Sequence, residues 1–360
     1  MLKSKLTILM APVLVMVVLA GVVLAQEPAQ SSALVGEGTA VIWDDVALSD
    51  AITFSMTGVT SPVPGTSYEG WVKMGSVEKS TGVMAIAANG SINHSASMGE
   101  NLILNYDHVV ITIEPVPDND PKPSGIVAFS ASIDSEPIKH IRHLLADWPS
   151  GSGVGILTNL QTQLNVAITH ANLAKNSDTI ADVHKHIEHV VNIIEGENGD
   201  NYGDLDGNGA VEDFGDGIGV LNHAANRTHA GFASVGLPEA SDVATHGALV
   251  DEYVMNISDW ATFARDQAIK ALGTTQVSLA KIFVGPGADS VITLLGSALN
   301  GSDIEGPGAS QAYVEAQRMA TYTFQVVPPT PTPTPMPTFT PTPIATPTAT
   351  PDPSLTATPT

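Results

Sequence analysis

The chain has 360 residues, no cysteine and a formal net charge of −23 at pH 7. The lack of cysteine excludes disulfides, thiol catalysis, thiolate metal sites and covalent haem attachment. The excess of acidic side chains repels nucleic acid and anionic membranes and favours cations, so we expect no nucleic-acid partner. Without disulfides the fold must rely on a hydrophobic core, and about 300 residues are enough for two domains.

The first 25 residues have the pattern of a secretory signal peptide. Lys3 and Lys5 precede an uncharged apolar run from Leu6 to Ala25, and the run ends in Val23-Leu24-Ala25. This order is typical of a signal that is cut after the last small residue. A retained membrane anchor is the alternative, because the run is long enough to span a bilayer. In both cases we expect an extracytoplasmic protein, secreted or attached to the cell surface, which touches the membrane only through an uncleaved N-terminal segment.

Removal of the signal strengthens the acidic character of the chain. Residues 1–25 hold two lysines and no acid, which leaves 12 Lys and Arg against 37 Asp and Glu, a formal charge of −25. At the other end, residues 327–360 consist mainly of proline and threonine. Such a segment cannot build a core and favours the extended polyproline helix, so we expect a disordered stalk.

Residues 34–134 alternate between apolar and polar side chains with a period of two. Ile52, Phe54 and Met56, for example, alternate with Thr53 and Ser55. This period, with frequent Gly, Pro, Asn and Ser between the runs, is typical of short antiparallel strands in a sandwich. The expected strands lie near 39–43, 51–57, 67–74, 82–87, 90–96, 108–115 and 126–133.

Three motifs in this region resemble one known family. Residues 68–72 read YEGWV, residues 110–115 read VITIEP and residues 121–127 read PKPSGIV. Together they look like the extracytoplasmic domain of anti-sigma-K factors, over roughly residues 50–134. The resemblance implies an extracytoplasmic sensing or binding module. Sigma-factor inhibition is not expected to carry over, because only five residues precede the apolar run, where the family has a cytoplasmic sigma-binding domain.

From residue 138 onward the apolar residues recur with the period of helices. Glycines separate the segments, which is typical of a helical bundle. The expected helices cover 138–148, 153–175, 179–195, 218–234, 239–272, 275–299 and 309–325. The sequence therefore predicts an α+β, multi-domain protein. It has an antiparallel β-sandwich over 34–134, an all-α bundle over 138–326 with an acidic glycine-rich loop at 196–217, and the stalk.

One flank of the helix expected at 179–195 carries side chains that could hold a transition metal. Asp182, His186 and His189 fall within about 60° of one another on a helical wheel. Imidazole and carboxylate ligands suit Zn²⁺, Mn²⁺ or Fe, and His170 or His246 from a neighbouring helix could complete the shell. The alternative is a hydrogen-bonded or solvated face with no metal. Haem held non-covalently by two histidines also stays open.

The acidic loop resembles an EF-hand calcium loop. Counted from Asp204, oxygen donors stand at Asp204, Asp206 and Asn208, followed by the carbonyl of Ala210 and by Glu212 at the ninth position. The twelfth position is glycine, so Asp213 or Asp216 would have to replace the usual closing acid. A weak structural calcium site is one interpretation. A surface loop rich in Asx turns is the other.

No motif of a nucleophile elbow, a phosphate loop or a zinc protease occurs in the sequence. We therefore expect a non-catalytic cell-surface protein with a structural calcium ion. Its partner would be an extracellular protein, a glycan or a small ligand. A bundle that binds a transition metal or haem is the alternative, and a membrane-anchored signalling relic of the anti-sigma type is the third hypothesis.

Overall fold

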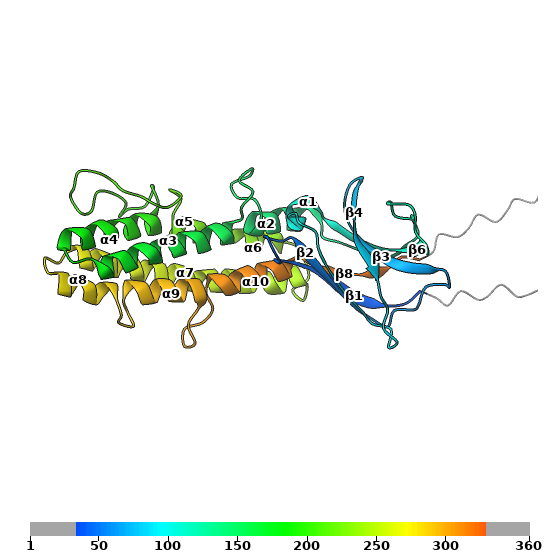
Figure 1. Ribbon diagram of the computed structural model, residues 1–360. Helices are drawn as coiled ribbons and strands as arrows, with labels where there is room; N and C mark the ends of the chain where they lie inside the picture. Colours follow the sequence, from blue (N-terminus) through cyan, green and yellow to red (C-terminus); the bar gives the residue numbers. More distant parts are fainter. Residues whose placement is uncertain (1–33, 329–360) are drawn as a thin grey trace, which may run out of the picture.

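The described chain, residues 34–328 of the computed structural model, places two β-sheets at one end of an elongated molecule and a helical bundle at the other (Figure 1). The expected signal segment and nearly all of the expected stalk lie outside the described residues. Leu34 and Pro328, the two ends of the described chain, both lie at the sheet end (Figure 1). An α+β fold with a sheet region followed by a helical region is therefore confirmed.

Both sheets are antiparallel. One has the strand order β5-β2-β1-β8 and the other has the order β4-β3-β6-β7-β9. The strands are β1 (Glu37–Trp43), β2 (Ala51–Thr57), β3 (Thr66–Met74), β4 (Val77–Met84), β5 (Ile92–Ser97), β6 (His108–Pro115), β7 (Val127–Ser132), β8 (Thr321–Thr323) and β9 (Gln325–Val326).

The two sheets pack face to face because their strands alternate as expected. In β2, Ile52, Phe54 and Met56 are buried while Ser55 is exposed. Gly70 of β3 lies against the Phe54 ring, since a Cβ added there would come 3.1 Å from Phe54 Cζ. The apolar faces therefore meet between the sheets, as in a sandwich.

The end of the chain differs from the prediction of a helix over 309–325. The last helix ends at Met319, and the following residues add β8 to one sheet and β9 to the other. The segment Thr321-Tyr322-Thr323-Phe324 alternates β-branched and aromatic residues, which favours strands. Tyr322 and Phe324 are buried in the sheet region, so the chain returns to the sandwich after it has built the bundle.

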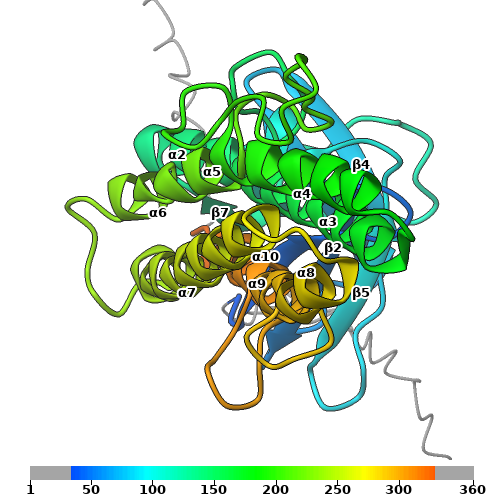
Figure 2. The same ribbon diagram turned by 90° about the vertical axis from the view of Figure 1, so that its left-hand side faces the viewer.

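The helices α3, α4 and α5 form one layer of the bundle, and α7, α8, α9 and α10 form the other (Figure 2). α7 is 31 residues long and spans the bundle at about 46 Å. The helices are α1 (Leu102–Asn105), α2 (Ser135–Leu145), α3 (Ile156–Asn176), α4 (Ile180–Glu195), α5 (Val220–Ala225), α6 (Thr228–Ala233), α7 (Asp242–Leu272), α8 (Val277–Val284), α9 (Val291–Asn300) and α10 (Ala309–Met319).

Two helices expected as single segments are divided. The segment expected at 275–299 forms α8 and α9, which are separated at Gly285-Pro286-Gly287, where proline lacks the N–H that a helix needs. The segment at 218–234 forms α5 and α6. The short α1, capped by the Asn101 side chain, was not expected.

One continuous cluster of buried apolar residues runs from the sandwich into the bundle. Many of its members in the long helices are small. In α3 the buried face includes Ala167, Ala171 and Ala174, and in α7 it includes Ala261 and Ala264. Small side chains let helix axes approach closely. Within residues 34–328, no helix is both long enough and apolar enough to cross a bilayer.

Candidate metal centre

α4 is buried on two faces, one apolar and one polar. Its apolar residues, such as Ile187 and Val191, face the core shared with α3 and α7. Its other buried residues are Glu188, His189, Asn192 and Glu195. A buried polar group must find hydrogen-bond partners. The partners on this side come mostly from the long loop between Gly196 and Gly219, which lies along the outside of α4 (Figure 1).

Glu188 and Asn192 hold this loop through its backbone. Glu188 Oε2 accepts from the N–H groups of Leu205 at 2.7 Å and Asp206 at 2.9 Å, and Glu188 Oε1 accepts from Glu212 N–H at 3.0 Å. Asn192 Oδ1 accepts from Gly203 N–H at 2.9 Å, and its amide donates to the carbonyls of Gly203 and Glu212. Charge-assisted bonds of this kind fix the loop against the helix.

Beside this contact, three histidines bring their ring nitrogens together. His186 and His189 are three residues apart, so both lie on one side of α4, and His170 faces them from α3. The Nδ1 atom of His170 lies 3.1 Å from Nδ1 of His189 and 3.4 Å from Nδ1 of His186. We call this group the distal cluster, because α4 lies in the half of the bundle remote from the sandwich (Figure 1).

Hydrogen bonds alone do not satisfy the distal cluster. Each ring nitrogen carries either one hydrogen or one lone pair, whereas Nδ1 of His170 faces two other nitrogens at once. A metal ion at their centre would accept a lone pair from each ring. Tetrahedral Zn²⁺ with Zn–N bonds of about 2.0–2.1 Å separates its nitrogen ligands by about 3.4 Å, which is close to the spacing of this cluster.

Glu212 fixes the tautomer of one of these rings. The other nitrogen of His189, Nε2, lies 3.2 Å from Glu212 Oε2. Because a carboxylate only accepts, Nε2 carries a proton, and in the neutral imidazole Nδ1 then keeps the free lone pair that faces the cluster. A carboxylate behind a ligating imidazole is a recurrent feature of metal sites. The contact with His189 is also the main cause that lowers the pKa of Glu212, with the nearby Lys185 contributing.

The cluster is partly shielded from water. The ring of His189 is only 1% exposed. The ring of Phe214, from the loop, lies 4.5 Å from the His189 ring and 5.0 Å from the His170 ring, although Phe214 itself is 55% exposed. Burial, followed by the neighbouring His189, lowers the pKa of His170 to about 4, and the same causes lower the pKa of His186. Both rings are therefore neutral near pH 7, the form that ligates metal.

The structure brings together only part of the transition-metal set expected from the sequence. His186 and His189 converge, and His170 is the third member. Asp182 instead belongs to the helix N-terminus, where its carboxylate accepts from the Thr179 hydroxyl at 2.6 Å. His246, the other residue expected to complete the shell, pairs with Glu315 at 2.6 Å.

The residues expected to bind calcium are divided among several contacts. Asp204, Asp206 and Asn208 accept hydrogen bonds from N–H groups within the loop itself, among them that of Ala210. Glu212 turns to His189, and Asp216 bonds Nε2 of His223 at 2.6 Å. The carboxylates of Asp204 and Asp206 lie within 4.8 Å of Glu188, a residue that was not among the expected ligands.

The sequence offered His170 as one of two residues that could complete the shell, and it assigned no role at the site to Glu188. Glu188 and Asn192 are polar residues four apart within the apolar run IEHVVNII. A polar pair in a buried stretch indicates a second buried face, and this was the signal that could have revealed the loop contact. Comparison with known proteins gives no match to a family model, a curated protein or a solved structure. The resemblance to anti-sigma-K factors therefore stays a prediction.

Proposed function

We propose that this protein binds a divalent transition-metal ion, with Zn²⁺ as the first candidate, at His170, His186 and His189. The observation that carries the proposal is the orientation of His189. Its Nε2 is held by Glu212 while its Nδ1 lies 3.1 Å from Nδ1 of His170. One side chain thus combines a fixed tautomer with a lone pair that faces the imidazole of His170, which in turn lies beside that of His186.

The ligand set favours some metals over others. Neutral imidazoles suit Zn²⁺, Cu²⁺, Ni²⁺ and Fe²⁺, whereas Ca²⁺ and Mg²⁺ prefer oxygen. Three protein ligands leave a fourth position for water or for a ligand from solution. The acidic surface of the chain, with its formal charge of −23, raises the local concentration of any cation. The imidazole ligands and the acidic charge together fit a role in capturing transition-metal ions selectively from dilute solution.

The proposed place of action is outside the cytoplasm, attached to the cell surface. The support is the secretory pattern of residues 1–25 and the Pro/Thr-rich segment at the other end of the sequence. Both ends of the described chain lie at the sandwich end, and the distal cluster lies toward the opposite end (Figure 1). A tether at either end would therefore present the metal site away from its point of attachment. The role is binding, with no turnover of a substrate.

A structural calcium ion is the second candidate, at the carboxylates of Glu188, Asp204 and Asp206. The observation that favours it is the approach of these three acids to within 4.8 Å of one another. A titration with calcium tests it, using the native chain and a variant with Asp204→Ala and Asp206→Ala. The calcium proposal predicts a melting temperature that rises with calcium only in the native chain, and an unchanged temperature in both would contradict it.

The experiment that tests the main proposal is calorimetric titration of the full-length, metal-free protein with Zn²⁺. We expect the double variant His186→Ala plus His189→Ala to bind one fewer zinc ion per chain than the native protein. His184→Ala is the matched control, because His184 lies on the same helix but outside the cluster. Equal zinc binding by the native protein and the double variant would overturn the proposal.

A further inference from the structure

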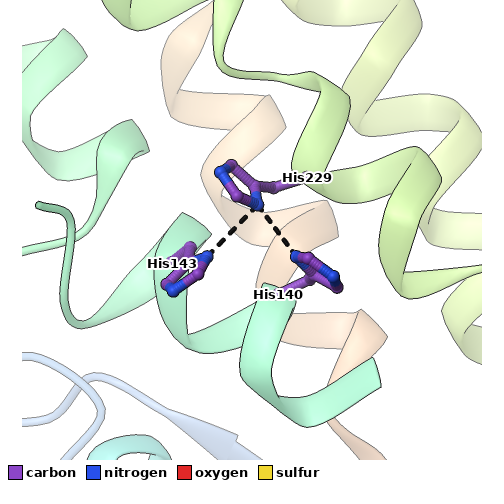
Figure 3. A group of neighbouring side chains, drawn as sticks. All are labelled: His140, His143 and His229. Atoms are coloured by element: carbon purple, nitrogen blue, oxygen red, sulfur yellow. Dashed lines mark hydrogen bonds between the residues drawn. The ribbon is translucent and has the colours of Figure 1, made fainter. Parts of the chain in front are cut away.

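A second group of three histidines lies in the half of the bundle next to the sandwich. His140 and His143 stand three residues apart on α2, and His229 reaches them from α6 (Figure 3). Nδ1 of His229 lies 2.9 Å from Nδ1 of His140 and 3.2 Å from Nδ1 of His143. We call this group the proximal cluster.

We propose that the proximal cluster is a second transition-metal site, independent of the distal one, which takes a divalent ion of the Zn²⁺ or Cu²⁺ type. Figure 3 shows His140 and His143 both directed at one nitrogen of His229. That single nitrogen cannot satisfy two neighbours with its one hydrogen or one lone pair. A cation bound by all three rings removes the conflict.

Core packing does not explain these histidines. The apolar residues of α2, such as Ile141 and Leu144, are the ones that enter the core. His140, His143 and His229 are only partly buried and meet outside that core, where two short helices touch. Polar side chains at such a place would ordinarily turn to water. Their convergence on one nitrogen instead is what a ligand set requires.

The electrostatic surroundings keep the rings uncharged. Burial, followed by the neighbouring rings of His143 and His140, lowers the pKa of His229 to about 4. Burial also lowers the pKa values of His140 and His143, and the ammonium of Lys139 adds to this. The opposing carboxylates are Glu136 beside His140 and Asp147 beside His143. Neutral imidazoles at pH 7 have lone pairs free for a metal.

The same local sequence builds both clusters. Residues 140–143 read His-Ile-Arg-His and residues 186–189 read His-Ile-Glu-His. In each, the isoleucine is fully buried in the core and fixes the rotation of its helix. In each, the third residue anchors a neighbouring segment: Glu188 accepts from the N–H groups of the loop, and Arg142 donates to the carbonyls of Ile103 and Tyr106. The two histidines are left on the side that faces the third ring.

An exposed aromatic ring also accompanies both clusters. Phe232 is 52% exposed, and its ring lies 5.4 Å from the ring of His140 and 5.9 Å from that of His229. It covers the proximal cluster as Phe214 covers the distal one. An exposed phenylalanine contributes little to the core, so its contact with two of the three imidazoles in both places indicates that it shields them from water.

The two clusters are too far apart to share one ion. The end of α2 packs on the start of α3, where a Cβ added to Gly155 would lie 2.3 Å from the backbone of Leu145. His170 lies 15 residues after Gly155, which in a helix is a distance of about 22 Å. Each cluster therefore needs its own ion, and binding at one does not depend on binding at the other.

The test is the number of zinc ions bound by the full-length protein and three variants. We expect two ions for the native chain, and one each for His140→Gln plus His229→Gln and for His186→Ala plus His189→Ala. The combination of all four changes is expected to bind none. His108→Gln, an exposed histidine on β6, is the control and should keep both ions.

Each other outcome decides between the two sites. One ion in the native chain that is lost only with the distal changes would overturn this inference and leave the proposed function intact. One ion in the native chain that is lost only with the proximal changes would overturn the proposed function and support a metal site at the proximal cluster. Circular dichroism and melting with a chelator present show whether each variant is folded, and the single variant His143→Gln repeats the proximal test with a smaller change.

Discussion

The two clusters each consist of three histidines, but the surrounding chain supports them differently. In the distal cluster the buried His189 is held from behind by Glu212, and the loop that supplies Glu212 is fixed by Glu188. In the proximal cluster, none of the three histidines forms a hydrogen bond to a carboxylate of residues 34–328. Two histidines three residues apart on one helix therefore come together through helix geometry alone. A fixed orientation of their rings needs a contact from another segment of the chain, as Glu212 provides for His189. We expect tighter zinc binding at the distal cluster.

Among the variants considered, removal of the Glu188 side chain should cause the largest loss of zinc binding at the distal cluster relative to the proximal cluster. Glu188→Ala leaves three loop N–H groups without their acceptor, and each charge-assisted bond is worth about 1.5–3 kcal/mol. We expect the free energy of unfolding to fall by roughly 3 kcal/mol or more, and distal zinc binding to be lost as the loop detaches. Denaturant unfolding and zinc titration measure the two effects.

The control for this change is Glu197→Ala, which removes an exposed acid from the same loop. It should alter stability by less than about 0.5 kcal/mol. Proximal zinc binding should persist in both variants. If Glu188→Ala kept its stability and both zinc ions, the loop would not be the support on which the distal cluster depends.

Much of the fold could be predicted from the sequence, because it depends on local periodicity. The alternation in β2 and the helical repeat of α4 both place their apolar residues as expected. β8 and β9 were missed because their alternating pattern covers only a few residues, which is too short to be told from the end of a helix without the neighbouring strands of the sheet.

The site was predicted only in part, because convergence between segments is not local. His186 and His189 share a helix, so their proximity follows from spacing alone. The approach of His170 depends on how α3 packs against α4. The position of Glu212 depends on a loop that Glu188 and Asn192 hold in place. The expected calcium pattern in this loop matched in sequence, but Glu212 lies against His189 in the structure.

A smaller and more specific effect is expected from Glu212→Gln. The amide can still contact His189 but no longer provides a negative charge behind the ring. Loss of such a partner usually weakens metal affinity by about 10-fold to 100-fold. We expect this at the distal cluster, with proximal affinity unchanged, in a zinc competition assay.

Lys185→Ala is the matched control for that variant, because Lys185 contacts the other oxygen of Glu212 at 3.7 Å. It removes a surface ion pair and leaves the contact with His189. Surface pairs of this kind contribute about 1 kcal/mol or less. A similar loss of zinc affinity in Lys185→Ala and Glu212→Gln would mean that general surface charge, and not the carboxylate behind His189, sets the affinity.

Removal of the phenylalanine ring beside each cluster should have the smallest effect on zinc binding, and the effect should be similar at both clusters. Phe214→Ala and Phe232→Ala each remove a ring that lies beside histidines. More water at the site weakens each metal–ligand contact only modestly, so we expect zinc to dissociate a few-fold faster at the matching cluster. Val211→Ala, an exposed change in the same loop as Phe214, should leave the rate unaltered.

Metal binding by the distal cluster can be seen by anomalous diffraction at the zinc edge, from crystals of the full-length protein grown with Zn²⁺. We predict a zinc peak about 2.0–2.1 Å from the Nδ1 atoms of His170, His186 and His189, with Nε2 of His189 still hydrogen-bonded to Glu212. No peak at this position, or zinc bound through Nε2 of His189, would contradict the account.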